Sequence, residues 1–131
     1  MNQIKKLIDK GASSQEWKEA LSQNPDWVES LKSYQDRSFN NIYQILMLKA
    51  SKDHTRRTAL HNIFSCFIEY QIPMFSTNNK NESPADTAER LALFPVLPLL
   101  REQERKESQI LYAHQQSQEL EEYLALLESV S

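Results

Sequence analysis

The sequence predicts an all-α protein: a compact bundle of five or six helices, forming one domain over residues 1–131, with a long C-terminal helix. The chain has one glycine in 131 residues, whereas sandwiches, barrels and phosphate-binding loops need glycines at tight turns. Residues 99–130 contain no glycine or proline and are rich in good helix formers. Apolar and small residues of this run recur at steps of three and four, at Ile110, Ala113, Ser117, Leu120, Leu124 and Leu127. We expect the earlier helices to pack onto this one.

The first two helices are predicted from their end signals. Residues 2–10 place apolar side chains on one side of a helix, and Gly11 follows where a left-handed residue ends a helix. Ser13 and Glu16 have the spacing of a capping box, in which each side chain accepts a hydrogen bond from the other residue's backbone N–H. A second helix is therefore expected to begin directly after Ser13.

Asparagine, aspartate and proline mark the boundaries of the middle helices. Asn24 followed by Pro25 predicts the cap and first residue of a third helix, which either continues through residues 38–41 or restarts there. Asp53 is a candidate cap for the next helix, which Pro73 ends. The apolar face of that helix is predicted to consist of Leu60, Ile63, Phe64, Phe67 and Ile68.

A polar loop and two prolines separate the last helices. Residues 74–83 are the most polar stretch and are predicted to form a flexible loop. Ser83, followed by a proline, opens a short helix. Phe94 and Leu97 each precede a proline, which disfavours the helical conformation and separates this helix from the long one. The apolar run 91–100 is expected to be a buried corner between them rather than a proline-rich ligand.

The charge of the chain is unevenly distributed. The net charge of −3 does not indicate a general nucleic-acid-binding protein. Residues 1–60 hold ten Lys and Arg against seven Asp and Glu, whereas residues 61–131 hold five against eleven. No Lys or Arg follows Lys106. The two halves can pair with each other, or the second half can offer an acidic surface to a partner.

No set of residues predicts catalysis, so we expect no enzymatic activity, no cofactor and no bound metal. Cys66 lies in an apolar helical stretch, where a free cysteine behaves as a small buried hydrophobe. Three histidines, His54, His61 and His114, are conceivable partners, but no cationic neighbour or helix N-terminus would activate the thiol. His54 and His61 share a helical face without a third zinc ligand at a supporting step.

The lone cysteine and the distribution of apolar residues bear on location. One cysteine excludes an internal disulfide and fits a reducing compartment. No apolar run approaches the roughly 18 residues needed to span a bilayer, and residues 1–6 lead into an amphipathic turn rather than a signal-peptide core. We expect a cytoplasmic protein that does not span a membrane, with export without a cleaved signal peptide as an alternative.

One basic cluster supplies an alternative function. Lys49, Lys52, Arg56 and Arg57 lie at a predicted turn and helix start, where a small helical regulator would contact DNA or RNA. The same cluster fits a solvated helix start or an internal complement to the acidic half of the chain. Because the protein as a whole is acidic, the nucleic-acid function remains the alternative.

The C-terminal residues 118–131 place a cluster of glutamates shortly before an end of small and apolar residues. This pattern resembles the glutamate-rich C-terminal export signal of effectors delivered by intracellular bacteria through the Dot/Icm type IV secretion system. The resemblance covers these 14 residues only. It implies a secreted bacterial effector or a regulator of one.

These observations together predict a non-catalytic protein–protein interaction module, such as an adaptor, a chaperone-like subunit or an inhibitor. The chain combines a long helix lined by small residues, an acidic face and no catalytic set. The expected partner is another protein, bound through the acidic C-terminal helix, with a homodimer as an alternative. Aromatic residues beside charge are typical of interfaces, so the expected contact residues are Tyr112, Glu119, Glu121, Glu122 and Tyr123.

Overall fold

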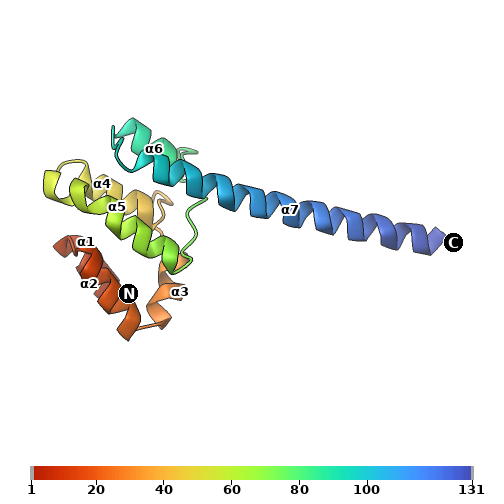
Figure 1. The fold of residues 1–131 in the computed structure, drawn as a ribbon, viewed down its shortest axis with the longest axis horizontal. Helices are drawn as coiled ribbons and strands as arrows, with labels where there is room; N and C mark the ends of the chain where they lie inside the picture. The colour runs from red at the N-terminus through yellow and green to blue at the C-terminus, as the bar shows by residue number, and fades with distance from the viewer. Residues whose placement is uncertain (1, 131) are drawn as a thin grey trace.

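The computed structural model describes residues 2–130; within them, the side chains of Asn2, His114, Gln115, Ser117 and Val130 lie outside the description. The predictions that involve the His114 and Ser117 side chains therefore fall outside the described residues. All regular elements in this range are helices, so the all-α class is confirmed (Figure 1). They are α1 (Asn2–Lys10), α2 (Ser14–Gln23), α3 (Asp26–Lys32), α4 (Ile42–Ala50), α5 (His54–Glu69), α6 (Pro84–Arg90) and α7 (Leu97–Val130). None of the described helices is both long and apolar enough to cross a bilayer.

Four predicted helix-end signals are confirmed: the glycine after α1 and the caps of α2, α5 and α6. Gly11 follows α1 with a φ of 75°, in the left-handed region that glycine adopts readily. The Ser13 hydroxyl accepts from the N–H of Glu16, and the Glu16 carboxylate accepts from the N–H of Ser13. Asp53 caps α5 through the N–H of Thr55, and Ser83 caps α6 through the N–H of Asp86. Short polar signals therefore define these boundaries locally.

The predicted cap of α3 is wrong, whereas the region after α3 follows one of the two predicted alternatives. The Asn24 side chain does not cap α3; it donates to the carbonyl of Ala20 at 2.9 Å, at the end of α2. Of the two alternatives at residues 38–41, the restart is confirmed, because Phe39 has a φ of 63° and Asn41 caps a new helix, α4. The described residues therefore form seven helices rather than five or six.

The core lies where α2, α4 and α5 meet around three aromatic rings. The Phe67 ring packs edge-on against Trp17 and Tyr43, with ring centroids 5.1 and 5.7 Å apart. All three side chains are fully buried. Edge-to-face pairs stabilise a core beyond their buried area, so this cluster holds the three helices together.

A buried polar network joins α4 to α6 and to the loop between α5 and α6. The Asn41 side chain donates to the carbonyl of Met74 at 3.0 Å and to the hydroxyl of Ser76 at 2.9 Å. The fully buried Gln44 amide donates to the carbonyl of Glu82 and to the hydroxyl of Thr87. Both ends of loop 74–83 are thereby attached to α4; its flexibility stays a prediction.

The long helix α7 is confirmed, but the earlier helices do not pack along it. Only its first turns contact the rest of the protein. The buried corner predicted over residues 91–100 is confirmed in part: Leu93, Val96 and Leu100 are buried, whereas Phe94 is 60% exposed. From Ser108 onward every residue with a described side chain is exposed, and the helix projects from the globular part (Figure 1). We call residues 2–96 the body, residues 97–107 the base of α7 and residues 108–130 the arm. The apolar spacing in the arm predicted a buried face, yet nothing within the described chain covers it.

Candidate interaction site on the C-terminal helix

The base of α7 is attached to the body by two carboxylates. Glu104 accepts a hydrogen bond from the N–H of Ala85, in the first turn of α6, at 3.0 Å. Glu107 accepts from the N–H groups of Met74 and Phe75 at 2.9 and 3.1 Å. These N–H groups have no partner within a helix or sheet, and a carboxylate is a strong acceptor for them.

This attachment could not be read from the spacing of charges along the helix. The sequence favours an ion pair between Glu102 and Lys106, four residues apart. In the structure, the Glu102 carboxylate binds Arg105 at 2.6 Å; this guanidinium, and to a lesser degree the charge of Lys106, lowers the pKa of the Glu102 carboxyl. The charged first third of α7 therefore has two sides. Glu102 and Arg105 face solvent, whereas Glu104 and Glu107 bind backbone N–H groups of the body.

Glu104→Gln is expected to change how stability depends on pH. Burial raises the pKa of Glu104, although the Ala85 N–H lowers it in part. A raised carboxyl pKa means that the folded state favours the protonated form; the resulting stability is present below the unfolded pKa of about 4.3 and is lost as pH rises through the folded pKa. Glutamine keeps the acceptor without the charge, so the variant should gain stability relative to the parent at pH 7, and this gain should shrink on acidification. Urea unfolding at several pH values measures it.

The control for this change is Glu119→Gln on the exposed arm. Its effect on the free energy of unfolding of the body should be near zero throughout. A Glu104→Gln difference that grows as pH falls would contradict the assignment of Glu104 as a carboxyl that is harder to ionise when folded.

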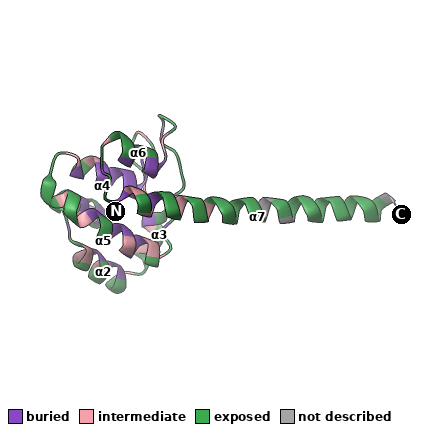
Figure 2. Ribbon diagram, turned by 45° about the horizontal axis from the view of Figure 1, so that its top comes forward, coloured by how far each residue is buried: buried purple, intermediate pink, exposed green. Residues whose placement is uncertain are grey.

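The described residues of the arm are exposed (Figure 2), and many of them are large and apolar. A helix in water normally turns such residues toward a core, and contiguous exposed apolar surface marks binding sites in soluble proteins. Those with at least half of their surface exposed are Ile110, Leu111, Tyr112, Leu120, Tyr123, Leu124, Leu126 and Leu127. The arm is therefore the candidate interaction site.

Three of the five predicted contact residues share one side of the arm. Each residue of an α-helix is rotated by about 100° from the one before, so Tyr112, Glu119 and Tyr123 fall in one row. Sequence reasoning missed Gln116, which lies in the same row; its amide donates to the Tyr112 hydroxyl at 2.8 Å. We call these four residues the tyrosine face. Glu121 and Glu122 are exposed but lie on other sides of the helix.

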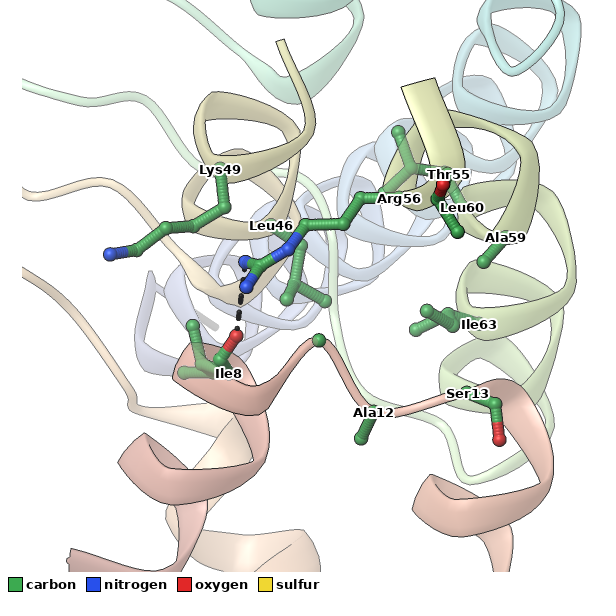
Figure 3. Close-up of a pocket in the computed structure, with 11 residues that line it drawn as sticks. Ile8, Ala12, Ser13, Leu46, Lys49, Thr55, Arg56, Ala59, Leu60 and Ile63 are labelled. Atoms are coloured by element: carbon green, nitrogen blue, oxygen red, sulfur yellow. Dashed lines mark hydrogen bonds between the residues drawn. The ribbon is translucent and has the colours of Figure 1, made fainter. Parts of the chain in front are cut away.

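Two arginines of the basic cluster bind carbonyls at the C-terminal ends of helices. The Arg56 guanidinium donates to the carbonyls of Ile8 and Asp9 at 3.2 and 2.7 Å, as Figure 3 shows for Ile8. Arg57 donates to the carbonyls of Ala50 and Ser51, at the C-terminal end of α4.

The remaining basic residues of this cluster are exposed. Lys49 lies 3.6 Å from the Asp9 carboxylate, and Lys52 is exposed. Cations stabilise helix C-termini. Because Arg56 and Arg57 bind carbonyls at such ends, the geometry favours the interpretation of this cluster as an internal structural element over nucleic-acid contact.

Two cavities of the body are lined by residues that the sequence analysis singled out. The cavity beside Arg56 has a volume of about 150 Å³, below the roughly 300 Å³ of small-molecule sites. An open groove of about 390 Å³ is lined by His54 and His61, which confirms that they share a face. Within the described residues, no three His, Cys, Asp or Glu side chains are grouped to hold a metal. Cys66 is buried, and burial raises the pKa of its thiol, which makes the thiolate scarcer.

Comparisons with protein-family models, with curated proteins and with solved structures found no match for this chain.

Proposed function

We propose that the protein is a non-catalytic protein-binding module, such as an adaptor, a chaperone-like subunit or an inhibitor, whose arm docks onto another protein. The observation that carries this proposal is the tyrosine face, because its two tyrosines expose 62 and 60% of their surface on a helix that projects from the body. Tyrosine combines a large apolar ring with a hydrogen-bonding hydroxyl and is enriched among residues that dominate binding energy.

The neighbouring charges indicate the chemistry of the surface that this face would bind. Glu119 lies between the tyrosines, and the arm holds further glutamates but no Lys or Arg. A partner surface with an apolar pocket and a basic rim would complement it. The resemblance of the tail to an export signal is compatible with this proposal, since residues 118–129 are exposed on the arm, but the proposal does not depend on export.

The proposal is tested by replacing both tyrosines with alanine in the full chain. Tyr112→Ala/Tyr123→Ala should weaken capture of the partner from a lysate of the source organism by roughly tenfold or more, with the helix content unchanged by circular dichroism. The purified partner then gives the affinity by titration calorimetry. Nuclease treatment of the lysate should leave the parent protein's capture intact.

Two exposed aromatic residues of the body supply the matched control. Phe75 and Phe94 expose 46 and 60% of their surface, and Phe75→Ala/Phe94→Ala should change capture by less than about threefold. Equal capture by the two double variants would remove the tyrosine face from the binding site. Capture that depends on nucleic acid would instead favour the basic cluster.

A further inference from the structure

The arm has a second apolar row, which the tyrosine face does not include. In the sequence this row follows alternating steps of three and four residues and has no charged member. We call it the seam: Ile110, Ala113, Ser117, Leu120, Leu124 and Leu127. Its large members expose between 50 and 69% of their surface. Going beyond the proposed function, we propose that the seam binds the seam of a second copy of this chain, with the two arms antiparallel.

The order of large and small residues along the seam selects the antiparallel arrangement. In a symmetric pair, residue i contacts residue j of the second copy and j contacts i. One antiparallel register places Ala113 opposite Leu124, position 117 opposite Leu120, and Ile110 opposite Leu127. The two smallest residues then each face a leucine, which is how facing layers interdigitate without voids.

A parallel pair would not fill the seam in this way. Each residue would face its own counterpart, so Ala113 would lie opposite alanine and position 117 opposite serine. Two successive layers would then contain no large side chain, and poorly filled layers are destabilising. A partner of different sequence is not needed to explain the small residues, since the leucines of the same chain complement them.

The direction of the seam leaves room for a second helix. With about 100° per residue, the seam is rotated by about 140° from the side of α7 on which Leu100, Glu104 and Glu107 contact the body. The arm of a second copy can therefore lie along the seam without meeting the body of the first copy. In the register given above, residue 107 lies opposite residue 130 of the second copy, so the described arms overlap over their full length.

The charges of the arm distinguish this pairing from the binding of a basic helix. Glu119 and Glu122 point away from the seam, so pairing does not bury them. Because both arms are acidic, their approach is opposed by repulsion that salt screens. Added salt should therefore strengthen self-association, whereas it would weaken the binding of a basic partner.

The first experiment compares two leucines two residues apart. Leu124, on the seam, and Leu126, off it, expose 50 and 63% of their surface. Leu124→Glu would place a carboxylate against Ala113 and should raise the dissociation constant of the dimer by roughly 100-fold or more. Leu126→Glu should change it by less than about threefold. Sedimentation equilibrium of the full chain at low and high salt measures both.

The second experiment tests the register by disulfide cross-linking in a Cys66→Ser background. Ala113→Cys and Leu124→Cys chains of different size should form a mixed disulfide when combined, and neither chain should cross-link efficiently to itself. Self-cross-linking of each chain without the mixed product would overturn the antiparallel arrangement.

A parent protein that stays monomeric up to its solubility limit, at low and at high salt, would overturn the dimer itself. So would equal effects of the two glutamate variants. These failures leave the tyrosine face untouched, because its test depends on capture by Tyr112 and Tyr123 rather than on self-association.

Discussion

Phe67→Ala is expected to lower the free energy of unfolding by about 3–5 kcal/mol, which is a large part of the stability of a domain of this size. The Phe67 ring is fully buried and contacts both Trp17 of α2 and Tyr43 of α4. Its removal leaves a cavity between three helices that cannot close without moving one of them. Urea unfolding followed by tryptophan fluorescence measures the loss, because Trp17 reports on the same cluster.

Phe94→Ala is the matched control for this loss. It removes the same atoms from a side chain that is 60% exposed, so the free energy of unfolding should change by less than about 1 kcal/mol. A Phe67→Ala variant as stable as Phe94→Ala would show that the aromatic cluster is not the centre of the core.

Gln44→Met is expected to cost about 2–3 kcal/mol, although methionine has nearly the same length and shape. The Gln44 carbonyl accepts from the N–H of Asn41 at 3.0 Å, and its amide donates to Glu82 and Thr87. Methionine makes none of these bonds and leaves the buried Asn41 N–H without a partner. Urea unfolding gives the loss, and hydrogen exchange should show faster opening of loop 74–83.

An exposed glutamine supplies the comparison for Gln44. Gln15 donates to the carboxylate of Glu19 at the surface, where water replaces the lost bond, so Gln15→Met should cost less than about 0.5 kcal/mol. If both methionine variants were equally stable, the Gln44 network would not contribute to joining α4 and α6.

Local signals in the sequence predicted much of the fold. Ser13 with Glu16, Asp53, and Ser83 with Asp86 are caps whose partners lie within three residues, so adjacent residues contain the whole interaction. The absence of glycine and proline after Pro98 predicted an uninterrupted helix in the same way. Asn24 misled because asparagine also binds carbonyls at helix ends, and the sequence does not show which end it binds.

The interactions that bind the body to α7 could not be predicted, because they join residues far apart in the chain. Glu107 binds backbone 33 positions away, and no spacing rule relates those residues. The apolar period of the arm indicated a face that favours burial, but periodicity does not identify what covers it. The sequence did contain the signal for the missing member of the tyrosine face: Gln116 lies four residues after Tyr112, the spacing of one helical row.

The attachment of α7 at one end makes it a lever. The helix has 34 residues, so it is roughly 50 Å long, and the part beyond Glu107 measures roughly 35 Å. A rotation of about 10° at the base would displace the tip by roughly 6 Å, since no glycine or proline follows Pro98 to introduce a kink. A small rearrangement of packing around Glu104 and Glu107 would therefore cause a large change in the position of the tip, and of a partner bound there, relative to the body.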